Sequence, residues 1–211
     1  MCPLFLVVEG MDGAGKSTQI ERLAAWLTEA GAEPVVTREP GATPIGAKIR
    51  DILLDPSHAE MDPRTEALLY AADRAQHAAK VIGPALAAGR VVISDRYVDS
   101  SLAYQGLARG LGLERILDLS LWATRDLLPD LVILLDVSPE LARGRAGTTD
   151  RIEQEAAAFH AQVSEAYREL ARRYPDRFAM VDAEAAPEVV EREIRRRVEE
   201  RFVARPAGSA R

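Results

Sequence analysis

Cysteine is almost missing from this sequence, and the single residue, Cys2, excludes an internal disulfide framework or a Cys-x-x-Cys zinc pair. Long apolar runs are missing too. The run from Pro3 to Val8 is too short for a membrane span and meets Glu9, so it predicts a buried strand. Excess positive charge is also missing, because the formal net charge is -6, which argues against nucleic-acid binding. We therefore expect a cytoplasmic protein with no nucleic-acid partner and no membrane attachment.

The order of apolar runs predicts the fold class. The 211 residues, 47% hydrophobic and 28% charged, suit a single domain over residues 1–202. Five short apolar runs alternate with helical stretches, which indicates an α/β fold of three layers, with a five-stranded parallel sheet between helices. The predicted strands are Leu4–Val8, Pro34–Thr37, Arg90–Ser94, Leu131–Asp136 and Arg177–Asp182.

Capping and periodicity predict several helices. Apolar residues recur at helical spacing from Ile20 to Leu27, and Gly31 supplies a stop. Asp62-Pro63 is typical of a helix start, and that helix should run toward Gly83-Pro84. Ser138-Pro139-Glu140 predicts another start of the same kind.

Two segments interrupt this regularity. Residues 144–150 hold two glycines and two threonines, so we expect a lid at about 143–152, with a new helix beginning at Arg151-Ile152-Glu153. The tail 203–211 contains Pro, Gly and Ser without periodicity, and we expect it to be disordered.

The strongest motif is the phosphate-binding pattern Gly-x-x-x-x-Gly-Lys-Ser, placed between a predicted strand and a helix. Its residues are Gly10, Met11, Asp12, Gly13, Ala14, Gly15, Lys16 and Ser17, with Thr18 directly after. Glycines let the backbone wrap phosphates with its N–H groups inward. Lys16 supplies charge to the β and γ phosphates, and Ser17 offers a hydroxyl to Mg²⁺. The pattern predicts an ATP site with Mg²⁺; a glycine-rich turn without a ligand is the alternative.

Two absences narrow the class of nucleotide-binding protein. The sequence has no Asn-Lys-x-Asp base reader, as a guanosine-specific switch requires, and no Leu-Ser-Gly-Gly-Gln signature of transporter ATPases. Kinases of small molecules remain.

An acid and a base end the third predicted strand. The carboxyl ends of parallel strands are where ligands bind in such folds. Asp95 can therefore hold Mg²⁺ or its water shell, and Arg96 can grip an acceptor phosphate with its planar fork. A structural ion pair is the alternative.

Two groups of polar and aromatic residues predict a binding site for a flat base. In a helix, Ser101, Tyr104 and Gln105 share one face, while Tyr70 and Arg74 form a second face. Tyr70 can stack on a ring, and the polar groups can contact its edge. The alternative for Tyr70 is a core aromatic.

The second strand ends in Thr-Arg-Glu-Pro-Gly at 37–41. A cis Pro40 would fix the backbone around Arg38 and Glu39. Arg50 is either a second phosphate clamp or a solvated helix arginine.

These motifs together resemble bacterial thymidylate kinases. Thr-Arg-Glu-Pro-Gly, Ala-Asp-Arg at 72–74, Asp-Arg-Tyr at 95–97 and Ser-Leu-Ala-Tyr-Gln-Gly at 101–106 occur in order, and the resemblance extends from Leu4 to about Phe202. It implies transfer of the ATP γ-phosphoryl group to dTMP, giving dTDP and ADP, with Mg²⁺ and usually as a homodimer. A kinase for another nucleoside monophosphate or a deoxynucleoside is the nearest alternative. A nucleotide-binding protein that has lost turnover is another.

The resemblance also implies residue roles. It implies that the dTMP phosphate is held by Arg96, Arg38 and Arg50, and that Tyr70 takes the place of a stacking phenylalanine. Thymine would be contacted by Arg74, Ser101 and Gln105, and Tyr104 would disfavour a ribose 2′-hydroxyl. Glu39 would lie at the substrate, and Asp12 and Glu153 would orient acceptor, metal or water. Some relatives carry an arginine where this chain has Gly13. The transition-state cation is therefore expected from the lid, as Arg143, Arg145 or Arg151.

Overall fold

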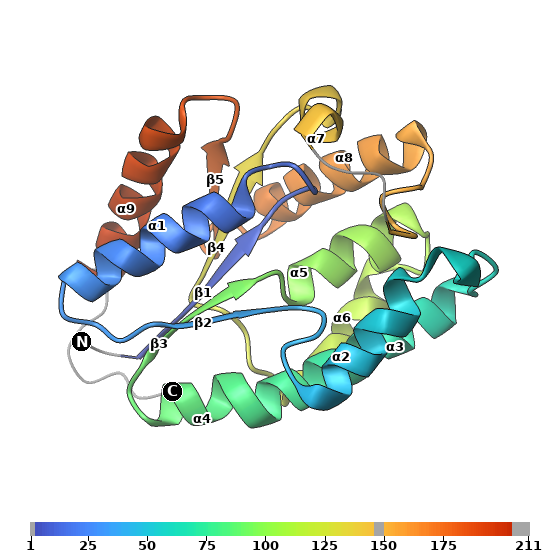
Figure 1. The fold of residues 1–211 in the computed structure, drawn as a ribbon, viewed down its shortest axis with the longest axis horizontal. Coiled ribbons are helices and arrows are strands. Elements are labelled where there is room, and N and C mark those ends of the chain that lie inside the picture. Colours follow the sequence, from blue (N-terminus) through green and yellow to red (C-terminus); the bar gives the residue numbers. More distant parts are fainter. Residues whose placement is uncertain (1–2, 146–149, 204–211) are drawn as a thin grey trace.

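The computed structural model describes residues 3–145 and 150–203. Within these residues, five strands form one parallel sheet in the order β2-β3-β1-β4-β5 (Figure 1). The strands are β1 Leu4–Glu9, β2 Val35–Arg38, β3 Val91–Asp95, β4 Leu131–Asp136 and β5 Phe178–Asp182. Their ends fall within one residue of the predicted ones, so the predicted fold class is confirmed.

Helices cover both faces of this sheet. On one face lie α1 and α9, and on the other lie α8, η3 and neighbouring helices (Figure 1). The bounds are α1 Lys16–Glu29, α2 Pro44–Leu54, η1 Pro56–His58, α3 Pro63–His77, η2 Ala78–Ile82, α4 Gly83–Ala87, α5 Val98–Ser101, η3 Leu102–Ala108, α6 Leu113–Thr124, α7 Pro139–Arg145, α8 Ala157–Arg173 and α9 Pro187–Val203.

The central strand β1 shows why the sheet is sandwiched. Leu4, Leu6 and Val8 pack in the core under α1 and α9, whereas Phe5 and Val7 pack in the core on the opposite face. Successive side chains of a strand point to opposite faces, so an uninterrupted apolar strand needs cover on both. No helix in the described parts of the chain combines the length and apolar character that a membrane crossing requires.

Helix α3 begins as predicted but continues farther. The Asp62 side chain accepts a hydrogen bond from the Arg64 N–H, and Pro63 occupies the first turn. The helix then passes through the π-helical turn η2 into α4 and ends at Ala87, beyond Gly83-Pro84. The Gly83 N–H bonds the Ala78 carbonyl five residues back, and this wider turn accommodates the proline ring, which would clash in a regular α-helix.

The segment after the predicted lid differs from expectation. The helix expected to start at Arg151 is a tight turn instead, and α8 begins at Ala157. The Asp150 carboxylate accepts from the Ile152 and Glu153 N–H groups, and the Arg151 N–H bonds the Leu54 carbonyl at the end of α2. Asp150 therefore caps a single turn, closed by the Gln154 N–H on the Asp150 carbonyl, and the Arg151 contact fastens that turn to the end of α2. The predicted lid residues 146–149 and tail residues 204–211 lie outside the described residues.

Candidate active site

The loop between β1 and α1 has the backbone that phosphate binding requires. Gly10 has φ of 144°, and a Cβ there would lie 2.8 Å from the Leu135 carbonyl oxygen on β4. Gly13 and Gly15 also have positive φ, at 85° and 89°. Side chains are strained in this region of φ, so glycine is the residue that lets the loop turn closely. Helix α1 starts at Lys16 and points its positive N-terminus at the loop.

The Lys16 side chain folds back onto the loop and bonds its carbonyl groups. Its buried ammonium donates to the carbonyls of Gly10 and Met11 at 3.1 and 3.0 Å, and it lies 3.4 Å from an Asp12 oxygen. Beside it lies a cavity of about 540 Å³, which we call the phosphate cavity. Its lining includes Ser17, Thr18, Arg38, Asp95, Arg96 and Arg145.

Asp95, at the end of β3, is suited to a cation. Its Oδ1 is buried and has no hydrogen-bond partner among the described residues. A buried carboxylate oxygen without a partner is costly unless a ligand satisfies it. Its place in the phosphate cavity, with the Ser17 hydroxyl in the same lining, fits Mg²⁺, which prefers oxygen ligands.

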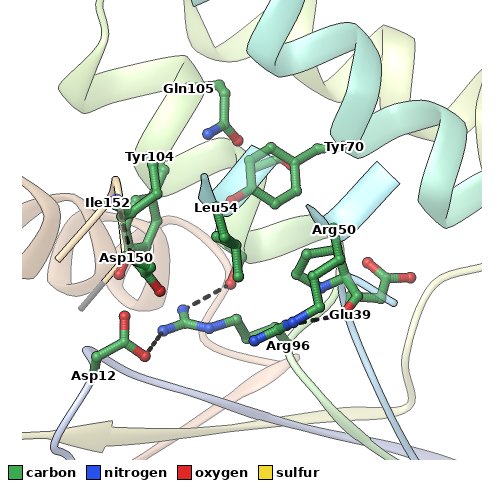
Figure 2. A pocket seen from close by; sticks show the side chains of 13 residues that line it. Asp12, Glu39, Arg50, Leu54, Tyr70, Arg96, Tyr104, Gln105, Asp150 and Ile152 are labelled. Atoms are coloured by element: carbon green, nitrogen blue, oxygen red, sulfur yellow. Dashed lines mark hydrogen bonds and ion pairs between the residues drawn. The ribbon is translucent and has the colours of Figure 1, made fainter. Parts of the chain in front are cut away.

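Arg96 lies at the centre of the site. Its φ of 70° is rare for a residue with a side chain, and its N–H bonds the Val8 carbonyl at 3.0 Å. Nη2 donates to Asp12 at 2.7 Å (Figure 2). Nη1 donates to the hydroxyls of Ser100 and Tyr167 at 3.2 Å each. Burial opposes ionisation of Asp12, but the charges of Arg96 and Lys16 hold the pKa of its carboxyl well below the ordinary value. The result is a fixed cation beside a fixed carboxylate.

The sequence prediction missed Glu9, which shares the Ser100 and Tyr167 hydroxyls with Arg96 as hydrogen-bond partners. This fully buried carboxylate accepts from the N–H groups of Tyr97 and Ser100 at 2.9 and 3.1 Å. It also accepts from the hydroxyls of Ser100 and Tyr167 at 2.7 and 2.8 Å. Burial raises the pKa of Glu9 to about 7, against the lowering effect of Arg96. A charged residue ending an apolar strand was the available signal, because such a group needs partners when buried.

A second hollow, the acceptor cavity, adjoins the phosphate cavity and shares four lining residues with it: Asp12, Glu39, Arg50 and Arg96. Figure 2 shows the Tyr70 ring, the Tyr104 ring and the Gln105 amide gathered around this hollow. The predicted set of Tyr70, Ser101, Tyr104 and Gln105 is therefore brought together, although the last two lie on the π-helical turn η3. The Ser101 Oγ is buried without a hydrogen-bond partner in the described parts of the chain.

The Pro40 turn is built as expected. The Glu39–Pro40 peptide is cis, and the Arg50 guanidinium donates to the Pro40 carbonyl at 3.0 Å. Arg50 lines both cavities, whereas the exposed Arg38 lines the phosphate cavity. Both arginines therefore lie where they can reach a phosphate.

Arg74 lies elsewhere than the resemblance implied. It is 1% exposed, lines neither cavity and donates to Glu39 at 2.8 Å and to the Tyr97 carbonyl at 2.9 Å. The buried Glu39 carboxylate also contacts His77 Nδ1 at 2.9 Å. A buried carboxylate needs such partners, so Arg74 supports the loop that holds Glu39.

The four charged residues considered for the predicted lid have different surroundings. Arg151 is buried, with its guanidinium bonded to Glu66 at 2.5 Å and to the Leu53 carbonyl at 2.9 Å. Glu153 lines neither cavity, and its carboxylate accepts from the Asp150 N–H at 3.3 Å. Arg143 is exposed on α7 and outside both linings, so Arg145 is the lid arginine that lines the phosphate cavity.

The sheet order and the glycine loop at the end of β1 define a P-loop phosphotransferase fold, with a hollow for a second ligand beside the phosphate loop. Comparison with known proteins identifies the family within this fold. The sequence profile of the thymidylate kinase family matches residues 8–194. The chain is 51% identical over 201 residues to thymidylate kinase of Clavibacter sepedonicus, covering 93% of this chain and 95% of that protein.

Other relatives agree. The chain is 46% identical over 197 residues to thymidylate kinase of Exiguobacterium sp., covering 92% of this chain and 93% of the relative. The crystal structure of thymidylate kinase from Ehrlichia chaffeensis superposes with a TM-score of 0.77 at 29% identity, covering 94% of this chain and 99% of that one. The chain therefore belongs to the thymidylate kinase family.

Proposed function

We propose that this dTMP kinase transfers the γ-phosphoryl group of ATP to dTMP across the border between the phosphate cavity and the acceptor cavity, yielding dTDP for dTTP synthesis. ATP would place its phosphates on the loop at residues 10–17, and dTMP would occupy the acceptor cavity. The observation that carries this assignment is the position of Arg96, which lines both cavities and is bonded to Asp12. A donor and an acceptor would meet at that guanidinium.

The chemistry at this border needs no dedicated base. The attacking oxygen of a nucleoside monophosphate is already ionised near neutral pH, so positioning and charge neutralisation supply the catalysis. Arg96, with Arg38 and Arg50, would hold the acceptor phosphate. Lys16 would leave the Gly10 and Met11 carbonyls to reach the β and γ phosphates.

Arg145, and not Arg143 or Arg151, would supply the transition-state cation. It lines the phosphate cavity together with Lys16, whereas Arg143 does not and Arg151 is committed to Glu66. Gly13 carries no positive charge into the loop, so a cation from α7 would complete the neutralisation.

Ser17 and Asp95 would hold Mg²⁺ at the same cavity. Within residues 3–145 and 150–203, no three His, Cys, Asp or Glu side chains gather into a metal cage. That arrangement suits Mg²⁺, which proteins usually hold through one or two carboxylates plus substrate phosphates. The ion would neutralise charge on the β and γ phosphates.

The acceptor cavity supports a pyrimidine base. Tyr70 offers a ring for stacking, Ser101 offers a hydroxyl that no described residue binds, and Gln105 offers an amide. Tyr104 lies against Arg96, with the guanidinium 5.4 Å from its ring centroid, so it would sit near the sugar.

We also propose a homodimer in the cytoplasm. Large apolar side chains are exposed on three neighbouring helices: Ile45 and Ile52 on α2, Leu68 on α3 and Trp122 on α6. Trp122 is 82% exposed, which is costly for so large a ring, and a second copy would cover this face. Sedimentation equilibrium of the wild type should give a dimer that Trp122→Glu weakens; a wild-type monomer at micromolar concentration would reject the proposal.

The function is tested by measuring ADP release with dTMP, dUMP, dCMP, dGMP and thymidine. We expect the highest kcat/KM with dTMP and a far lower value with thymidine, since thymidine lacks the phosphate that the arginines at the cavity border need. A clear preference for thymidine over dTMP would reject this site assignment.

A further inference from the structure

The amide of Gln105 has only one orientation that its surroundings accept. Its Nε2 donates to Glu66 Oε1 at 2.8 Å, deep in the wall of the acceptor cavity. No hydrogen bond from a described residue reaches its Oε1. Figure 2 shows this amide at one end of the cavity, with its oxygen on the side of Tyr70.

Glu66 can fix this orientation because an ionised carboxylate only accepts hydrogen bonds. Rotating the amide by half a turn would place its carbonyl oxygen against the carboxylate, where two acceptors repel. The carboxylate is kept ionised although it is 1% exposed, because Arg109 and Arg151 contact its Oε2 at 3.2 and 2.5 Å. Burial raises the pKa of Glu66, but these partners and Gln105 outweigh that effect and lower it overall.

A fixed amide has consequences for the base. With one N–H used by Glu66, Gln105 presents a carbonyl oxygen and a second N–H to the cavity. Thymine and uracil carry an N3–H donor beside the O4 acceptor, which complements that pair. Cytosine carries an N3 acceptor beside an N4 donor, which opposes it at both positions.

We infer that Glu66 is a positioning residue that sets the base specificity of this kinase, by holding the Gln105 amide in the orientation that accepts thymine or uracil and rejects cytosine. This inference rests on the proposed function, because it takes the acceptor cavity as the dTMP site. Glu66 itself lines neither cavity, so it would influence the base through the Gln105 amide that it holds.

The test is the ratio of kcat/KM for dTMP to that for dCMP in Glu66→Gln. A glutamine at 66 can donate or accept, so the Gln105 amide can turn and the ratio should fall roughly tenfold to hundredfold. The ratio of dTMP to dUMP should stay within about twofold, because both bases carry the same N3–H and O4 groups. The matched control is Glu155→Gln, which removes the same charge from the same cluster, since Glu155 pairs with Arg109, whereas the hydrogen bond of Gln105 within the described residues goes to Glu66.

A folded Glu66→Gln enzyme that keeps the wild-type preference for dTMP over dCMP would overturn the inference, as would an equal loss in Glu155→Gln. If circular dichroism shows that Glu66→Gln does not fold, Gln105→Leu is measured instead. The ratio of kcat/KM for dTMP to that for dCMP should fall in this variant as well, and an unchanged ratio overturns the inference. Wild-type enzyme with no preference for dTMP would instead defeat the proposed function.

Discussion

The buried carboxylate of Glu9 makes stability depend on pH in a way that one substitution should remove. Its pKa rises from an ordinary value of 4.5 to about 7 in the folded protein. Between these values the folded state binds a proton on Glu9 that the unfolded state has lost. Stability from this group is therefore fully present below pH 4.5 and disappears as pH rises through 7.

The expected magnitude follows from that difference. At about 1.4 kcal/mol per pH unit, a rise from 4.5 to about 7 corresponds to about 3 kcal/mol. Glu9 is fully buried, so solvent screening does not reduce this figure greatly. Glu9→Gln should keep the local hydrogen bonds, because the hydroxyls of Ser100 and Tyr167 can accept from an amide as well as donate to it.

The assay is urea unfolding of wild type and Glu9→Gln at pH 5 and pH 8. The free energy of unfolding of the variant, relative to wild type, should increase by about 2–3 kcal/mol between the two pH values, because the variant avoids burying a charge at pH 8. Glu60→Gln, which changes an exposed carboxylate, should show no such change. An equal stability difference between Glu9→Gln and wild type at both pH values would refute the reasoning.

Three further predictions concern catalysis. Arg96→Ala should lower kcat/KM for dTMP by about 10²–10³-fold, because a phosphate clamp is lost; normal kinetics would reject its role. Arg145→Ala should lower kcat by about a hundredfold or more with ATP binding largely kept, while Arg143→Ala stays near wild type; single-turnover and ATP-binding measurements decide, and the reverse result would assign the role to Arg143. Ser101→Ala should raise the KM for dTMP about five- to tenfold at nearly constant kcat, because one hydrogen bond to the substrate is lost; an unchanged KM would show that the hydroxyl does not contact dTMP.

Local patterns in the sequence determined the fold and the donor side of the site. The glycines at 10, 13 and 15 needed no tertiary information, because their loop and its lysine form one continuous segment. The parallel strands were predictable for the same reason, since apolar runs covered on both faces differ sharply from the helices between them. Ser101, Tyr104 and Gln105 were found because all three lie within five residues on one helical stretch.

Only the tertiary structure decided which charges face a cavity and which face each other. Arg74 and Arg96 are alike in sequence, each following an aspartate, yet one is enclosed by Glu39 and the other opens onto both cavities. Glu9 and Glu66 are buried carboxylates whose hydrogen-bond partners lie as many as 158 residues away in the sequence. A motif records residue type and spacing along the chain, whereas the fate of a buried charge depends on groups that folding brings to it from distant segments. Separating the arginines that line a cavity from those enclosed by the protein therefore required the packed structure.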